Sequence, residues 1–452
     1  SCNNCCHGSC NGDRTSLCSS AISTAIDHSG APSLSYPVIC FYVHLDRFNS
    51  GVFWLFAAVF ILSITTLPYV ILATLSGLRT VDSSQIEVAR SLGLTPVQTF
   101  RRVVFPQVKS HVSAGALLAA LYTISDFGAV SLLNVETLTV TIQNMYRASY
   151  DRSAAAVISF VLIAFSTIVV LADERVKQQS SDGSVVKVYT TKNSLIRSSW
   201  LRFLVIATIA LFALVAVIIP FYVLITRFMS NRVATDWGDL LSASISTISV
   251  AALGALIALV LSAPLGIVLS TGSTRFGRIA QRMITVGHGL PGVVVGLAVV
   301  SIGSKLGALY QTIFLLAFAY ALLFLAKSVA SMSASLSRVP SSVKDVASTL
   351  GMNQWMIIKK VVAPIAAPGI SLGTVLVFLT AMKELPATLM LRPTGFDTLA
   401  THIWSAASIN RFNEAAPYAL ILVLIAALPT FLISRPDKAD RTFIHETMGS
   451  EK

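Results

Sequence analysis

The chain has 452 residues, of which 54% are hydrophobic and 12% are charged, and its mean hydropathy is +0.74. Soluble globular domains rarely reach these values, because their surfaces carry a larger share of charged residues. The formal net charge of +12 can indicate a nucleic-acid partner, but Lys and Arg residues scattered through loops need no such partner. Composition therefore predicts an integral membrane protein that lies in a lipid bilayer and binds no nucleic acid.

Residues 1–50 form an atypical N-terminal segment. Clustered cysteines can bind zinc or an iron–sulfur cluster, but the spacing here matches neither kind of site. The segment also lacks an initiator Met and a signal-peptide pattern. We expect an incomplete or aberrant start that is poorly ordered, with one helix remnant near 35–48. The cysteines of the chain are Cys2, Cys5, Cys6, Cys10, Cys18 and Cys40.

Nine apolar runs follow, and each is long enough to cross a bilayer, which takes about 20 helical residues. They are dense in Leu, Val, Ile and Ala without period-two alternation, so helices are predicted and an outer-membrane barrel is not. The sequence GHGLPG at 287–292 predicts a helix break that packs against neighbouring helices. The expected fold is an all-α, polytopic transmembrane helical bundle of about nine helices. The runs lie near 52–76, 111–132, 153–172, 199–225, 243–271, 284–304, 309–330, 365–391 and 415–434.

Between these runs the chain repeats itself, because residues 78–133 and 336–391 align without a gap at an offset of 258 residues. The first copy reads EVARSLGLTPVQTFRRVVFP from Glu87, and the second reads DVASTLGMNQWMIIKKVVAP from Asp345. Transporters are commonly built from two related halves around a central pathway. The repeat therefore predicts a duplicated membrane unit.

The repeat divides the chain into two tandem units. Residues 51–175 hold three of the predicted spans and residues 199–435 hold six, so the first unit is expected to be truncated. Residues 176–198 are expected to be a cytoplasmic linker, and residues 436–452 a cytoplasmic tail. Cytoplasmic loops retain Lys and Arg, and placing both repeated inserts in the cytoplasm leaves 21 of these residues on that side and 7 on the other.

Each polar insert has the pattern of a docking element. In the first copy, Val88, Leu92 and Val97 can face a groove, and Gly93 permits a tight bend between two short helices. Pro106 opens the next span, where its missing N–H costs nothing. One such insert would fit an ordinary amphipathic helix pair at the membrane surface, but two copies at a fixed offset favour docking. The second copy keeps the plan with Val346, Leu350, Gly351 and Pro364.

Neither insert contains a nucleophile with a base, a metal quartet or a phosphate-binding loop, and the remaining sequence shows no such pattern. His288, beside the helix break, has no second His or Cys at ligand spacing. We therefore expect no catalytic residue, no metal site and no cofactor bound by this chain.

The inserts resemble the E-A-A…G…P loop of binding-protein-dependent ABC importer permeases, in which a cytoplasmic coupling helix sits in a groove of the ATP-hydrolysing subunit. Val88 and Val346 replace an alanine of the family motif, and Asp345 replaces its glutamate. Ile358 stands where phenylalanine is common. The expected ATPase-coupling residues are Glu87, Ala89, Gly93, Phe100 and Pro106 in the first copy and Asp345, Ala347, Gly351, Ile358 and Pro364 in the second.

This resemblance implies two tandem permease repeats in one chain, which engage two ATP-binding-cassette ATPase subunits. ATP and Mg are then expected on those subunits, and the chain itself is a translocation subunit and not an enzyme. It also implies a multi-pass location in the bacterial inner membrane, transport by alternating access, and a periplasmic binding protein that delivers the solute. Loops near 133–152, 226–242 and 392–414 are its expected docking surface.

The stretches MKELPATLMLRPTGFDTLATHIWSAAS at 382–408 and ISDFGAVSLLNVETLTVTI at 124–142 resemble ferric-iron importer permeases. The resemblance implies ferric iron as the solute. A permease for thiamine, a polyamine or a phosphonate would keep the same loops and remains an alternative. A secondary transporter driven by an ion gradient is a further alternative and would need no ATPase.

These stretches place Asp126, Lys383 and Glu384 within predicted spans, and Asp126 and Glu384 are equivalent in the repeat. Ionised groups in hydrocarbon cost several kcal/mol unless they face protein or water. Both carboxylates fall in the outer part of their helices, so we expect them to line the substrate pathway or an outer gate. Ferric ions favour such oxygen ligands. An internal ion pair of a carboxylate with Lys383 or Arg392 is the alternative.

Overall fold

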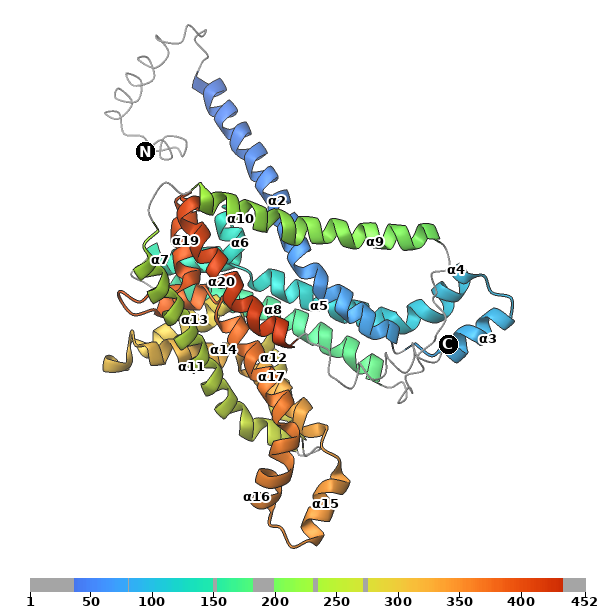
Figure 1. Cartoon of the computed structure of the whole chain (residues 1–452). Coiled ribbons are helices and arrows are strands. Elements are labelled where there is room, and N and C mark those ends of the chain that lie inside the picture. The colour runs from blue at the N-terminus through green and yellow to red at the C-terminus, as the bar shows by residue number, and fades with distance from the viewer. Residues whose placement is uncertain are drawn as a thin grey trace. The chain divides into compact units, whose positions relative to one another are not determined.

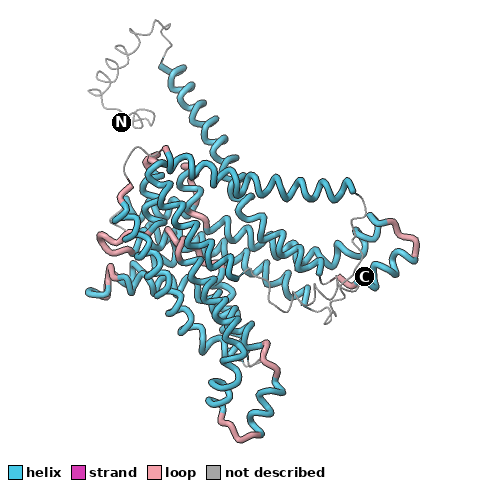
Figure 2. Tube along the Cα trace, viewed as in Figure 1, coloured by secondary structure: helices cyan, strands magenta, loops and turns pink. Residues whose placement is uncertain are grey.

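A computed structural model describes residues 36–79, 81–148, 153–181, 199–230, 235–270 and 275–433. Regular structure throughout these ranges is helical, without a strand (Figure 2). This confirms the predicted all-α fold. The cysteine cluster before residue 36, most of the predicted linker and the predicted tail lie outside the described residues.

The chain separates into two compact units, residues 1–60 and residues 61–452. One helix, α2 (Tyr36–Arg79), contains the boundary between them. Its 44 residues correspond to a length of about 66 Å at 1.5 Å per residue, roughly twice the thickness of the bilayer hydrocarbon. The backbone of the predicted helix remnant near 35–48 belongs to this helix from Tyr36 onward.

After α2, the first half continues with two short helices, a π-helical turn and a set of longer helices (Figure 1). Helix α8 extends to Ser181, so the first residues of the predicted linker are helical. The elements are α3 (Ser83–Ser91), α4 (Pro96–Thr99), η2 (Phe100–Val104), α5 (Phe105–Ser125), α6 (Gly128–Leu132), α7 (Leu138–Ala148) and α8 (Ser153–Ser181).

The second half repeats this order after additional helices at its start. The bounds of α3, α4 and η2 recur 258 residues later in α15, α16 and η5, which confirms the predicted repeat. The elements are α9 (Ser199–Ala213), η3 (Leu214–Ile218), α10 (Ile219–Met229), α11 (Trp237–Ser270), α12 (Arg275–His288), α13 (Gly292–Gly303), η4 (Gly307–Leu309), α14 (Ile313–Ser337), α15 (Ser341–Thr349), α16 (Gln354–Ile357), η5 (Ile358–Val362), α17 (Ala363–Ala381), α18 (Pro386–Leu391), α19 (Leu399–Ser408) and α20 (Phe412–Ile433).

Within the described residues, seven helical segments are long and apolar enough to cross a membrane. They correspond to seven of the nine predicted runs. The run near 111–132 is instead α5, whose first half is polar, followed by a break at Asp126. The run near 284–304 is divided between α12 and the short apolar helix α13, because Pro291 supplies no N–H to continue a helix. The seven segments are Phe53–Leu78, Ser153–Ala172, Phe203–Met229, Trp237–Ser270, Ile313–Ser337, Gln354–Ala381 and Phe412–Phe431.

Small residues allow the helices to approach closely, as is typical of membrane interfaces. A Cβ at Gly254 of α11 would lie 2.9 Å from the Tyr320 Cβ of α14, and Ser328 donates a hydrogen bond to Ser262 across the same helix pair at 2.8 Å. The predicted break at 287–292 is packed as expected. A Cβ at Gly289 would lie 2.5 Å from Val170 Cγ2 of α8.

Candidate functional site

The first repeated insert is a helical hairpin closed by local backbone hydrogen bonds. Helix α3 ends in a Schellman motif, because the Leu94 N–H donates to Ala89 O at 3.1 Å and the Gly93 N–H donates to Arg90 O at 3.0 Å. Gly93 adopts a φ of 81°, in the left-handed region that favours glycine. The bend expected at Gly93 is therefore set by the backbone of this one residue.

The second short helix of the hairpin is capped by side chains. Thr95 and Gln98 form a capping box, in which the Gln98 N–H donates to Thr95 Oγ1 at 3.4 Å and the Thr95 N–H donates to Gln98 Oε1 at 3.0 Å. Gln107 Nε2 of α5 also donates to Gln85 Oε1 of α3 at 3.0 Å. The hairpin is thus tied to the beginning of the following long helix.

The second insert has the same geometry. The Met352 N–H donates to Ala347 O at 3.2 Å, the Gly351 N–H donates to Ser348 O at 3.0 Å, and Gly351 has a φ of 76°. Asn353 replaces Thr95 as the cap, and its Oδ1 accepts from the Met356 N–H at 2.8 Å. The same hairpin geometry therefore occurs twice in the chain, with different capping side chains.

The alanines of the motif are buried. Ala89 and Ala347 retain only 4% and 5% of their accessible surface. Ala347 packs in one cluster with Met332 and Leu336 of α14. Ala347 therefore joins the second hairpin to the body of the protein.

The opposite face of each hairpin is apolar and exposed. Leu92 and Leu350 expose 76% and 74% of their surface, among the highest values for large hydrophobic residues here. Exposed apolar patches of this kind mark interaction sites. Sequence reasoning missed Trp355, although the 258-residue offset makes it the equivalent of Val97 in the second copy. We call the two sets the coupling surfaces: Val88, Leu92 and Val97 in the first, and Val346, Leu350 and Trp355 in the second.

The remaining expected coupling residues lie around these surfaces. Ile358 is partly buried at the start of η5, whereas its counterpart Phe100 is exposed at the start of η2. The other residues are exposed: Glu87, Pro106, Asp345 and Pro364.

The two membrane carboxylates have equivalent backbone partners. Asp126 Oδ2 accepts from the N–H groups of Ala129 at 3.1 Å and Val130 at 3.4 Å, at the start of α6. Glu384 Oε1 accepts from the Ala387 N–H at 3.3 Å, at the start of α18. Ala129 and Ala387 are also related by the repeat. Each carboxylate therefore caps a short helix that begins where a long helix ends.

Tyr122 is a further polar group near these carboxylates. The Tyr122 phenol lies within electrostatic range of both carboxyl groups, and its ring lies 5.6 Å from that of Tyr69. Sequence reasoning missed Tyr122, because a tyrosine in a span is more often an interfacial anchor. Lys383 is exposed, and Arg392 forms an ion pair with Asp397.

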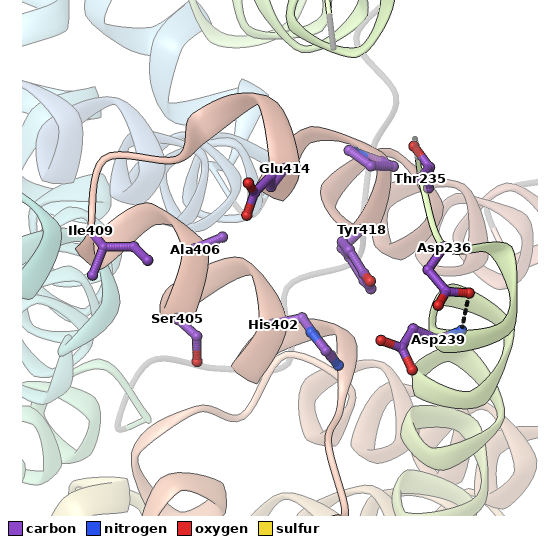
Figure 3. A pocket seen from close by; sticks show the side chains of 10 residues that line it. Thr235, Asp236, Asp239, His402, Ser405, Ala406, Ile409, Glu414 and Tyr418 are labelled. Carbon is purple, nitrogen blue, oxygen red and sulfur yellow. Dashed lines mark hydrogen bonds between the residues drawn. The ribbon is translucent and has the colours of Figure 1, made fainter. Parts of the chain in front are cut away.

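A pocket of about 330 Å³ joins two of the loops expected to dock a binding protein, 226–242 and 392–414 (Figure 3). Asp236, Asp239 and Glu414 line it, and the His402 ring stacks on Tyr418 with centroids 4.6 Å apart. Burial lowers the pKa of His402, while the Asp239 carboxylate opposes this shift. The lining of the pocket carries three carboxylates and neither Lys nor Arg, and Glu414 forms an ion pair with Arg411 at 3.5 Å.

Comparison with known proteins gives matches over most of the chain. The family model described as "Binding-protein-dependent transport system inner membrane component" matches residues 29–180 and 262–435. The "Fe(3+)-transport system permease protein FbpB 2" of Haemophilus influenzae is 32% identical over 394 residues, which are 86% of this chain and 77% of that protein.

Shorter and weaker matches also occur. The "Putative 2-aminoethylphosphonate transport system permease protein PhnV" of Salmonella typhimurium is 29% identical over 148 residues, 32% of this chain and 56% of that protein. A solved structure of the inward-facing MetNI methionine ABC transporter is 14% identical and covers 44% of this chain and 95% of its own, with a TM-score of 0.38.

Proposed function

This chain belongs to the binding-protein-dependent transport system inner membrane components, and from this premise we propose that the solute it carries is ferric iron. Membership makes the chain the membrane-embedded permease of an ABC importer, a translocation subunit and not an enzyme. Such systems work with ATP-hydrolysing and solute-binding partners.

The observation that carries the iron proposal is the similarity to an Fe(3+) permease over 86% of the chain, whereas the aminoethylphosphonate permease matches only 32%. The chemistry of the residues near the pathway is compatible with it. Asp126, Glu384 and Tyr122 offer oxygen atoms, which hard trivalent cations prefer. We propose that the two carboxylates attract the cation along the substrate pathway. Lys383 is proposed to lie beside this pathway.

The proposed ATPase partners are two subunits, one on each coupling surface. Each surface would enter a groove of its subunit, and ATP and Mg would bind there and not to this chain. Because a Schellman motif, a cap and a buried alanine fix each hairpin, a displacement of the groove would be passed to the helices behind it. ATP can shift the permease between inward-open and outward-open states only through a difference in affinity for the two.

On the opposite side, we propose docking of a periplasmic binding protein over loops near 133–152, 226–242 and 392–414, including the acidic pocket. The location that follows is the bacterial inner membrane, which the chain crosses several times. Solute would pass from the binding protein between the two halves and leave on the cytoplasmic side.

Co-purification followed by reconstitution tests this function. The chain should co-purify with two ATPase subunits, and proteoliposomes of the complex should take up labelled ferric iron only with ATP and the loaded binding protein. An excess of thiamine, polyamine or phosphonate should not compete. Uptake without an ATPase that an ionophore abolishes would instead identify a secondary transporter, and competition by another solute would reject iron.

We expect the double variant Gly93→Val and Gly351→Val to bind the ATPase subunits at least tenfold more weakly. A side chain in the left-handed region costs about 1–2 kcal/mol, and no atom lies within 4 Å of an added Cβ at either glycine, so the backbone alone is strained. Binding is measured by titrating labelled ATPase subunit. Gly307→Val is the matched control, because Gly307 has a φ of 56° and equal free space outside the hairpins. An equal loss in the control would contradict the prediction.

A further inference from the structure

The two halves contact each other through one aromatic side chain from each half. Tyr146 lies on α7 of the first half, and Trp404 lies on α19 of the second half. The Tyr146 hydroxyl donates to Met390 O of α18 at 3.4 Å, and Trp404 Nε1 donates to Ser131 Oγ of α6 at 3.2 Å. Each half thus reaches onto the short capped helix of the other half.

Trp404 makes further contacts with the first half. Its ring lies 6.2 Å from that of Phe127, and the Arg147 guanidinium lies 5.1 Å from the ring centroid, within cation–π range. Phe127 and Val130 of the first half pack with Leu385 and Leu389 of the second half in the same cluster. The contact between the halves therefore consists of an apolar cluster together with side-chain hydrogen bonds.

This contact lies at a specific place along the proposed pathway. It is built on α6 and α18, whose first turns donate N–H hydrogen bonds to the carboxylates of Asp126 and Glu384. In Figure 1, α6, α7 and α19 lie together, whereas the hairpins α3–α4 and α15–α16 project elsewhere. The halves therefore meet away from both coupling surfaces.

We propose that Trp404 and Tyr146 form a reciprocal latch that closes the outer end of the solute pathway. The inference rests on the proposed alternating-access function, because opening that end requires the halves to separate there. Separation moves α6 away from α19 and α18 away from α7, so both hydrogen bonds and the Phe127–Trp404 contact must break. The latch is a positioning device and does not itself bind the solute.

Two measurements on the complex with its ATPase subunits test the latch. They are the labelling of a cysteine placed at the contact and the amount of ATP hydrolysed per solute transported. In a background where the six cysteines are replaced by serine, Leu389→Cys reports on the seam, because Leu389 packs in the cluster. Without ATP, Trp404→Ala should increase the labelling of this introduced cysteine at least tenfold when a membrane-impermeant maleimide is added from outside. The same variant should hydrolyse at least threefold more ATP per solute transported.

Two conservative variants isolate the hydrogen bond. Trp404→Phe keeps an aromatic ring but loses the indole N–H, and Ser131→Ala removes the acceptor, so both should raise labelling by the same smaller factor. Their combination should add nothing to either one, since both remove a single interaction. Trp200→Ala is the matched control, because Trp200 is an exposed tryptophan of α9 away from the seam.

The latch proposal would be overturned if Trp404→Ala were labelled at the wild-type rate and hydrolysed the wild-type amount of ATP per solute. It would also be overturned if the effects of Trp404→Phe and Ser131→Ala on labelling were fully additive. If Trp404→Ala does not fold, the two conservative variants decide in the same way. The labelling experiment needs no solute, so it tests the latch independently of the proposed function. Failure of the proposed function would instead be seen as a wild-type complex that does not take up iron.

Discussion

Glutamate at both Leu92 and Leu350 will abolish binding of the ATPase subunits while the permease itself stays folded. Each leucine exposes about three quarters of its surface in the isolated chain, so its replacement removes little internal packing. In a complex, each would be buried in a partner groove. Burying an unpaired carboxylate costs about 3 kcal/mol or more, and this is roughly a hundredfold in affinity at each surface.

Size-exclusion chromatography with light scattering gives the number of ATPase subunits bound per chain. The double variant should elute alone, and each single variant should retain one subunit, because the two coupling surfaces lie on separate hairpins. Leu306→Glu is the control, since Leu306 is an exposed leucine in the turn between α13 and α14. A double variant that still elutes with two subunits would show that the coupling surfaces are not where the ATPase binds.

The hairpins could be predicted from sequence because their determinants are local. Gly93 and Gly351 supply the left-handed residue of a Schellman motif, and the neighbouring Thr95 and Asn353 cap the next helix. Each of these devices acts within six residues, so the sequence alone reveals it. The fixed offset then strengthened the prediction, because the second copy is an independent occurrence of the same pattern.

Features that depend on tertiary contacts could not be predicted in this way. The hydrogen bond from Trp404 to Ser131 joins residues 273 positions apart. The pocket brings Asp236 together with Glu414 from a different part of the chain. The capping roles of Asp126 and Glu384 require the long helices to end just before them, and an apolar run does not indicate where its helix breaks.

The double variant Asp126→Asn with Glu384→Gln will lose at least nine tenths of ATP-dependent iron uptake while it assembles normally with its partners. An amide keeps an oxygen that can accept from the N–H groups of Ala129 and Ala387, so α6 and α18 remain capped. It removes the negative charge that we propose attracts the cation. The loss of transport should therefore occur without a change in thermal stability.

Alanine at the same two positions separates charge from capping. It removes both, and each lost cap costs about 1 kcal/mol, so the alanine variant should lose uptake and also melt at a lower temperature than the amide variant. Uptake is measured at equal protein in proteoliposomes, and melting by intrinsic fluorescence. If the amide variant transports at the wild-type rate and only the alanine variant fails, the carboxylates act as helix caps alone. The attraction of the cation would then have to come from other groups.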